Sequence, residues 1–464
     1  MGRAAVHRLR AGSGATATRG VRGVTVLALS GTTVDHLPRY AAALVLLVLA
    51  VLVLRTRLRL AFAGWLVAVC FVPVWAGITL KVDLEPHVVA SVGLVVCLLP
   101  VAARRRGTAA RFTWGDALFL GFFATSLLAA FAGRLLFTDL FVLAVQWGGA
   151  FLAGRLIGYR VPLPQVFGAV AVAFTVVAVL TLVEFATGFN PFVLVPGSGS
   201  LHQIWSTIQV RGGQARAEGA FGSSIALGAG LALAVPLTLA APFKPALRLA
   251  MVVLMLAASV VTFSRIGLVT AVIGLVVTVL LLRGALPLRL RATVSVGLAV
   301  VALASSSLLD RVFTAAGTEA SDSASYRITL LELVPTMRPF GSATSMYRLP
   351  TGERFFGSFH SIDNALLLLG LTYGWVPLAF VVGLFLLGLG CLASGRVTAP
   401  TIAVLAQLPA FGTVALITQY STLTWFVAGL AVFAQSTRRR PAASGGAAPA
   451  AVEAPVPPAL AAVP

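Results

Sequence analysis

Three hydrogen-bonding side chains stand just before a leucine-rich run: His360, Asp363 and Asn364 in the stretch GSFHSIDNALLLLGL. A neutral imidazole can accept the proton of a hydroxyl group, and an imidazolium can bind a phosphate. Asp or Asn before an apolar run also commonly caps a helix by accepting hydrogen bonds from free backbone amides. The sequence therefore leaves capping and ligand binding open for Asp363 and Asn364, and favours proton transfer or phosphate binding by His360.

Arginines and acidic residues gather together in two polar segments, residues 187–220 and 309–362. The guanidinium is planar and always charged, so it suits carboxylates and phosphates. Pairing with nearby acids, such as Arg216 with Glu218, is one explanation, and an anionic ligand is the other. Arg265, at the start of an apolar run, can instead extend its charged group to the membrane surface. The candidate ligand-binding residues are Arg211, Arg216, Glu218, Arg265 and Arg327.

The sequence predicts neither a metal ion nor a cofactor. The five histidines have no metal-ligand spacing, and the three cysteines lie inside apolar runs without a C-x-x-C pair. A net charge of +20 would suggest nucleic acid for a soluble protein. Because the arginines stand in short loops without interleaved aromatic residues, no nucleic-acid partner is expected.

The composition is that of a protein embedded in lipid. Of 464 residues, 59% are hydrophobic and 10% are charged, and the mean hydropathy is +0.98. A soluble domain is about 25% charged. Apolar runs of about 17–25 residues, enough to cross the hydrocarbon core as helix, recur without period-two alternation. The sequence predicts an all-α polytopic membrane protein with about 12–13 transmembrane helices.

The expected spans are near 40–54, 60–80, 86–102, 114–133, 136–157, 164–186, 221–242, 247–263, 266–282, 292–308, 365–393, 397–418 and 421–436. Arginines in the short loops between them fall on one side, which the positive-inside rule makes cytoplasmic. The two polar segments, 187–220 and 309–362, are then extracytoplasmic loops. Thirteen spans would place the basic N-terminus outside, so either one span is miscounted or this tail is an exception.

Three regions are expected along the chain. Residues 1–38 are a basic tail, residues 39–436 are the transmembrane domain, and residues 437–464 are a disordered Pro/Ala-rich cytoplasmic tail. Within the second loop, Tyr326 to Met337 has apolar residues at helical spacing and is followed by a proline, which predicts an amphipathic helix.

Four motifs resemble the O-antigen ligase and polymerase superfamily. QARAEGAFGSSIALGAGLALAVPL (Gln214–Leu237) is similar to its Arg then Gly-x-Phe signature before a small-residue helix. VTFSRIGLVTAVIGLVV (Val261–Val277) resembles its Ser-Arg helix pair, and SASYRITLLELVPTMRPFGSATSMY (Ser323–Tyr347) its large loop. The Asn-initiated span within Gly357–Trp375 follows in the family's order. The resemblance covers roughly residues 160–395, which is the expected ligase- or polymerase-like core.

The chain departs from this family's pattern at two places. Ser223 and Ser224 stand where members often have Pro-Asn, and Asp363 stands where they often have the His before the Asn. His360 is three residues earlier, an arrangement that some members also show.

The resemblance implies a metal-independent membrane glycosyltransferase at the outer face of the cytoplasmic membrane. Its donor would be a glycan on polyprenyl pyrophosphate, its acceptor a glycan or lipid-linked sugar, and its further partners the bilayer and glycan-export proteins. His360, Arg216 and Arg265 would be catalytic, and Arg211, Glu218, Arg327, Asp363 and Asn364 would bind substrate. The motifs do not distinguish ligase from polymerase.

Two alternatives stay open. A secondary transporter would need ionisable groups near the bilayer midplane, and Asp116, Asp139 and Glu184 all stand near span ends. A member of the same superfamily without catalytic activity is the other. Only two of the 34 basic residues are lysine, which suggests a GC-rich bacterial genome and favours a capsular, exopolysaccharide or wall glycan over lipopolysaccharide.

Overall fold

The computed structural model describes residue 51 and residues 55–437, apart from 80–81, 105–110, 198, 212–213, 283–286, 290, 293, 296–324 and 351–352. Residues from Ala50 onward form one compact unit. The predicted tail 1–38, residues 438–464, and nearly all of the expected spans 40–54 and 292–308 lie outside the described residues.

The described chain is mostly helical. Its α-helices are α3 (Leu58–Phe71), α4 (Pro86–Arg104), α5 (Trp114–Phe131), α6 (Phe137–Phe141), α7 (Gly148–Ile157), α8 (Leu163–Thr187), α9 (Gly199–Trp205), α10 (Ser224–Leu239), α11 (Pro245–Val261), α12 (Arg265–Leu281), α16 (Ala365–Tyr373), α17 (Trp375–Ala393), α18 (Ala399–Leu405), α19 (Leu408–Phe411) and α20 (Thr418–Thr437). A π-helical turn, η2 (Val142–Trp147), joins α6 to α7. Short 3-10 helices are η1 (Val74–Ala76), η3 (Pro191–Leu194), η4 (Gly219–Phe221) and η5 (Leu331–Thr336).

Three antiparallel strand pairs correct the all-α prediction in detail. They are β1 (Ile78–Thr79) with β2 (Asp83–Leu84), β3 (Val210–Arg211) with β4 (Gln214–Ala215), and β5 (Met346–Arg348) with β6 (Arg354–Phe356). All three lie in connections between helices, and the last two lie in the segments predicted to be polar loops. Those segments contain no helix long enough to span a membrane among their described residues.

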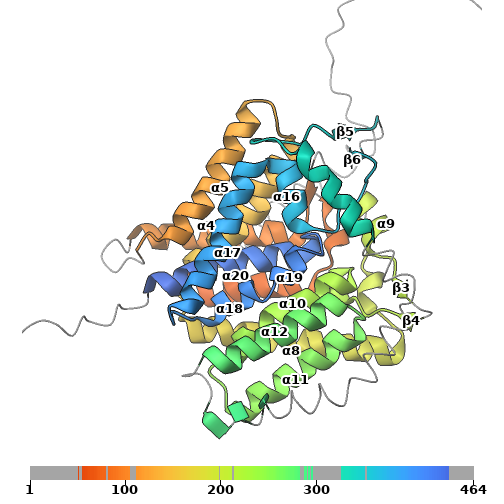
Figure 1. Cartoon of the computed structure of the whole chain (residues 1–464). Helices are drawn as coiled ribbons and strands as arrows, with labels where there is room; N and C mark the ends of the chain where they lie inside the picture. Colours follow the sequence, from red (N-terminus) through yellow and green to blue (C-terminus); the bar gives the residue numbers. More distant parts are fainter. Residues whose placement is uncertain are drawn as a thin grey trace, which may run out of the picture. The chain divides into compact units, whose positions relative to one another are not determined.

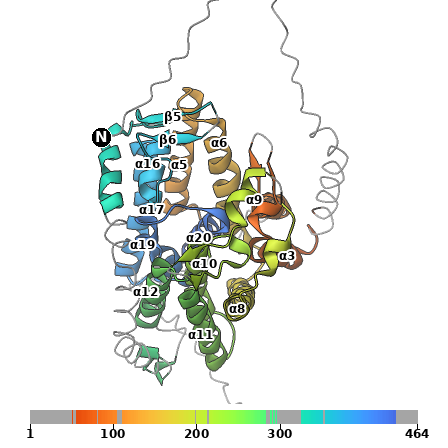
Figure 2. The ribbon, with the colours of Figure 1, turned by 90° about the vertical axis from the view of Figure 1, so that its right-hand side faces the viewer.

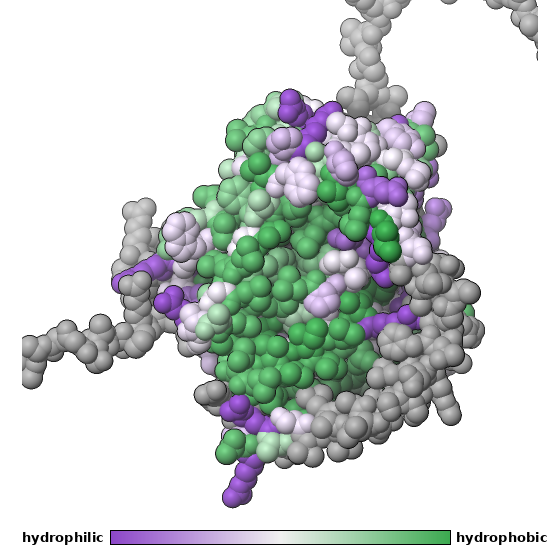
Figure 3. Space-filling view, in the orientation of Figure 1, coloured by the Kyte–Doolittle hydropathy of each residue, from purple (hydrophilic) through white to green (hydrophobic). Residues whose placement is uncertain are grey.

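The described helices indicate a membrane protein. Four are long and apolar enough to cross a bilayer: Trp114–Phe131, Phe137–Ile157, Leu163–Thr187 and Trp375–Ala393. Six further apolar helices are shorter, at 10–17 residues. The face in Figure 3 is hydrophobic over its middle and hydrophilic at its upper edge. Large apolar side chains are exposed at helical spacing on α8, at Val172, Val176, Val179 and Val183, as expected for contact with lipid.

Two predicted spans are interrupted in the structure. Residues 365–393 form α16 and α17, which meet at Gly374 with φ 101°. A Cβ there would lie 2.7 Å from the carbonyl oxygen of Pro339, and the amide of Trp375 donates to the carbonyl of Arg338 at 2.9 Å. The loop that docks here therefore breaks the helix. Residues 397–418 likewise form the two short helices α18 and α19.

Helix α10 lies at the centre of the packing. Nearly all of its side chains are buried, and it contacts α8, α11, α12, α18 and α20 (Figures 1 and 2). A helix that is apolar on every side belongs inside a bundle. Its crossing with α12 is close, since a Cβ on Gly267 would lie 2.8 Å from the Cα of Gly228. This contact places the start of α12 beside the start of α10.

The amphipathic helix predicted in the second loop is confirmed. Residues 325–336 are helical, first as α-helix and then as η5, and Leu330, Leu333 and Met337 are buried. These side chains form a small core with Phe356 and the start of α16. The loop residues thus have a defined structure of their own on top of α16 and α17.

A labelling experiment tests the predicted orientation. In a cysteine-free background, an impermeant maleimide is expected to label Thr207→Cys and Ser358→Cys in intact cells, because both residues are exposed in the predicted outer loops. Ser394→Cys, exposed at the opposite end of α17, should react only after permeabilisation. The reverse pattern would contradict the predicted topology.

Candidate functional site

Arg216 is buried, 7% exposed, in the connection between β4 and η4. Its Nε donates to the carbonyl of Thr262 at 3.0 Å, and its Nη2 donates to the carbonyl of Phe263 at 3.5 Å. Both carbonyls belong to the turn between α11 and α12, where Phe263 has φ 50°, an uncommon conformation for a bulky residue. A cation beside the last carbonyls of a helix is favourable. Arg216 therefore holds this turn in place.

Arg265 follows the same turn. The Ser264 hydroxyl accepts from the amide of Gly267 at 3.2 Å and so caps α12, which makes Arg265 the first residue of that helix. The Arg265 side chain is half-buried. The fold thus brings Arg216, which is far away in sequence, to the short turn at residues 262–264 that directly precedes Arg265.

Glu218 is 2% exposed and completes this group. Its carboxylate accepts from the amide of Gln209 at 3.2 Å, and Gln209 also accepts from Arg216 at 3.5 Å. Burial raises the pKa of Glu218 to about 7, and the charge of Glu184 adds to this rise, while the Gln209 amide and Arg216 oppose it. A carboxyl group with this pKa can hold or release a proton near neutral pH.

Glu184, at the end of α8, supports Glu218 from the other side. Its carboxylate accepts from the amides of Glu218 at 3.1 Å and Gly219 at 2.9 Å, and from the side chain of Asn190 at 3.0 Å. Asn190 also donates to the carbonyl of Gly219 at 3.2 Å. Glu184 and Asn190 therefore fix the backbone that carries Glu218. Sequence analysis missed Asn190, and it identified Glu184 only as an acid near the end of an expected span.

Glu218 should make stability depend on pH. Its pKa is raised from 4.5 to about 7 in the folded protein. The stability associated with its protonated carboxyl group is therefore fully present below pH 4.5 and is lost as pH rises through 7. The free energy of unfolding should then fall by up to about 1.4 kcal/mol per pH unit across this window. Thermal melting in detergent at successive pH values measures this slope, which Glu218→Gln should reduce. Glu332→Gln, at an exposed loop position, should keep it. An unchanged slope in Glu218→Gln would contradict this assignment.

The second group of predicted residues lies around β6 and the start of α16. Asn364 is the N-cap of α16, because its Oδ1 accepts from the amide of Leu367 at 2.9 Å, so the capping interpretation is confirmed for this residue. Asp363 is exposed and accepts from Ser361 at 3.5 Å. His360 is exposed, with its ring 5.1 Å from that of Phe355.

Arg327 is exposed on the helix at 325–330, next to Tyr326, whose hydroxyl donates to the carbonyl of Ser361. This bond joins the Arg327 helix to the His360 segment. Arg211 lies in β3, paired with Gln214 of β4, and its backbone is all that the structure describes. The predicted residues therefore fall into two groups with different neighbours, one around the α11–α12 turn and one around the start of α16.

The three acids that a transporter would have to use, Asp116, Asp139 and Glu184, all have partners. Asp116 accepts from Arg155 at 2.6 Å, and Asp139 accepts from Arg354 at 2.6 Å. Glu184 is bound as described above. The Asp139–Arg354 pair anchors the β5–β6 hairpin to α6, and sequence analysis missed it because 215 residues separate the two. These contacts give each acid a structural role.

Within the described residues, no three His, Cys, Asp or Glu side chains lie close enough to share a metal ion. The chemistry that the first group can supply is electrostatic: two arginines, one half-buried and one buried, beside a carboxyl group that can be protonated near neutral pH. Such a group suits an anionic ligand at the end of α11 and the start of α12. Comparison with family models, with curated proteins and with solved structures gives no match for this chain.

Proposed function

We propose that this chain is a membrane glycosyltransferase of the O-antigen ligase and polymerase type, acting on glycan carried by polyprenyl pyrophosphate at the outer face of a bacterial cytoplasmic membrane. The observation that carries the proposal is that Arg216, which lies beside Glu218, donates to the carbonyls of the α11–α12 turn, which Arg265 directly follows. These residues come from two of the motifs that resemble the superfamily. The apolar helices on either side provide the lipid environment that a polyprenyl carrier requires.

In the proposed reaction, an acceptor hydroxyl oxygen forms a bond to the anomeric carbon of the donor sugar. The bond from that carbon to the pyrophosphate oxygen breaks, and its electron pair leaves with the pyrophosphate. The proton of the hydroxyl goes to a base on the acceptor side, and His360, in the group around the start of α16, is the residue predicted for this role. Negative charge grows on the leaving group, and fixed positive charge stabilises it most where water is excluded.

Arg216 and Arg265 would supply this charge in different ways. Arg216 is fixed by backbone carbonyls, so its guanidinium cannot reorient far during the reaction. Arg265 is half-buried at the start of α12 and would reach the pyrophosphate itself. A neutral Glu218 would leave their combined charge uncancelled, whereas an ionised Glu218 would weaken it.

A superfamily member without transferase activity is the second candidate, because the same contacts also have a structural effect. Arg216 stabilises a turn with an unusual backbone conformation, and this structural role requires no substrate. The transporter alternative is less well supported, since its candidate acids are each engaged in fixed contacts.

Reconstitution tests the proposal directly. Purified protein in liposomes is combined with the lipid-linked glycans extracted from its own source cells, and product is separated by size. Longer or transferred glycan, with release of polyprenyl pyrophosphate, is the expected result. Heat-inactivated protein is the control. No product from the native donor pool, with protein shown to be folded, would contradict transferase activity.

A further inference from the structure

A large cleft lies between α5, α17, α18 and α20, away from the α11–α12 turn. Its volume is about 950 Å³, at the upper end of the range for ligand pockets. Most of its wall is apolar, with contributions from Leu384, Phe385, Leu405, Phe411 and Ala428. A soluble anion has no favourable contacts with such a wall, whereas hydrocarbon chains do.

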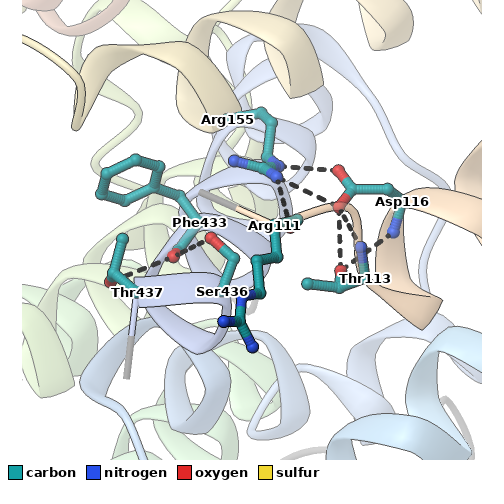
Figure 4. Close-up of polar contacts among 7 residues, drawn as sticks. All are labelled: Arg111, Thr113, Asp116, Arg155, Phe433, Ser436 and Thr437. Atoms are coloured by element: carbon teal, nitrogen blue, oxygen red, sulfur yellow. Dashed lines mark hydrogen bonds and ion pairs between the residues drawn. The ribbon is translucent and has the colours of Figure 1, made fainter. Parts of the chain in front are cut away.

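One end of the cleft is basic. Arg111 and Arg396 both line it, and both side chains belong to exposed residues. Their backbones are fixed: Arg155 donates to the carbonyl of Arg111 at 3.3 Å, and Gln435 donates to the carbonyl of Arg396 at 2.7 Å. Figure 4 shows the bond from Arg155 to the carbonyl of Arg111. Two arginines from distant parts of the sequence are thus held at one mouth.

Asp116, at the start of α5 beside this mouth, is already paired with an arginine. Asp116 accepts from Arg155 at 2.6 and 3.1 Å, and from the backbone and hydroxyl of Thr113 at 2.8 and 2.9 Å (Figure 4). The negative charge of Asp116 is therefore compensated behind the cleft. An anion between Arg111 and Arg396 would meet two positive charges. Asp116 is paired with Arg155, and no Asp or Glu is among the described residues that line the cleft.

Aromatic residues mark the depth of this end in the membrane. Phe112 is 71% exposed and Trp114 is 76% exposed, and both line the cleft beside Arg111. Exposed tryptophan beside arginine is typical of the boundary between hydrocarbon and headgroups. The basic mouth is thus at headgroup level, and the apolar wall continues from it into the hydrocarbon.

The tight contact between α5 and α17 lies away from this end. α5 and α17 touch where a Cβ on Gly121 would lie 2.4 Å from the Phe380 ring and one on Gly383 would lie 3.1 Å from Leu118. Beyond this crossing, the start of α5 and the end of α17 both contribute lining residues, among them Gly115 and Ala117 from α5 and Leu387 and Gly388 from α17. The arginine end of the cleft therefore lies past the tight contact between α5 and α17.

We propose that this cleft binds one anionic phospholipid of the bilayer, with its phosphate between Arg111 and Arg396 and its acyl chains against α17, α18 and α20. Basic pockets between membrane helices are suited to anionic headgroups. The site is independent of the glycan reaction, because none of its residues belongs to the α11–α12 turn or to the His360 segment.

Native mass spectrometry of the full chain in detergent tests the site. The protein is titrated with phosphatidylglycerol and with phosphatidylcholine of identical acyl chains, and the wild type should bind the anionic lipid more tightly. An arginine near an anionic headgroup strengthens binding about fivefold. Arg111→Gln combined with Arg396→Gln should therefore weaken phosphatidylglycerol binding about 30-fold. Arg160→Gln, an exposed arginine that does not line the cleft, should bind as the wild type does.

The native thiols give a second readout that needs no variant. Cys391 is half-buried and lines the cleft, whereas Cys70 and Cys97 are buried elsewhere. A lipid-soluble maleimide should alkylate Cys391, and phosphatidylglycerol should slow the reaction more than phosphatidylcholine does. Equal binding of the two lipids, unchanged binding by the double variant, or displacement of the lipid by inorganic phosphate would overturn the proposal. Slow alkylation that no lipid affects would show that part of the chain itself covers the cleft, and would overturn it too.

Discussion

Replacing Gly429 or Gly154 with alanine should destabilise the protein severely. The two residues lie where α20 crosses α7, and each faces the backbone of the other helix. A Cβ on Gly429 would lie 2.0 Å from the carbonyl oxygen of Phe151, and one on Gly154 would lie 1.9 Å from that of Phe426. Backbone cannot move aside as a flexible side chain can, so the two helices would have to separate. Overpacking commonly costs about 1–3 kcal/mol, and we expect at least the upper value for each alanine.

The sign of this effect makes the prediction specific. Alanine normally favours a helix over glycine by about 1 kcal/mol, so helix propensity alone predicts stabilisation. Gly149 provides the matched control, because it lies on the same helix and a Cβ there would have nothing within 4 Å. Thermal melting and the yield of monodisperse protein measure the outcome. If Gly154→Ala and Gly149→Ala melt at the same temperature, the close crossing does not exist.

Replacing Arg216 with alanine should lower glycan transfer by about 10²–10³, the usual effect of removing a fixed stabiliser of transition-state charge. Lysine keeps the charge but loses the planar fork that contacts both Thr262 and Phe263. Arg216→Lys should therefore have intermediate activity. The rate is measured with native lipid-linked donor in proteoliposomes and is divided by the amount of folded protein.

This normalisation matters because Arg216 also supports the fold. Loss of its hydrogen bonds to the α11–α12 turn should lower the melting temperature as well as the rate. Arg338→Ala is the control, because Arg338 is an exposed arginine of the other polar segment. Folded Arg216→Ala with near-normal transfer would show that the residue only holds the turn, and that the chemistry lies elsewhere.

Features that arise within a single segment could be predicted from the residues of that segment. Long apolar runs predict helices because backbone in lipid must satisfy its own hydrogen bonds. The spacing of Leu330, Leu333, Val334 and Met337 predicted a helix from Tyr326 to Met337, which is confirmed because residues 325–336 are helical. The cap at Asn364 was one of two local interpretations, and its bond to Leu367 spans only three residues. Such signals need no knowledge of the remaining chain.

Contacts between residues far apart in the sequence depend on how the helices pack. Arg216 reaches Thr262 across 46 residues, Glu184 reaches Gly219 across 35, and Asp139 reaches Arg354 across 215. The break between α16 and α17 likewise depends on a loop that docks at Gly374, so an unbroken apolar run gave the wrong helix. An apolar stretch predicts that a segment will be buried or will face lipid, but many packings satisfy that requirement equally well. Close contacts and long-range hydrogen bonds exist in only one of those packings, and for that reason they could not be predicted from the residues alone.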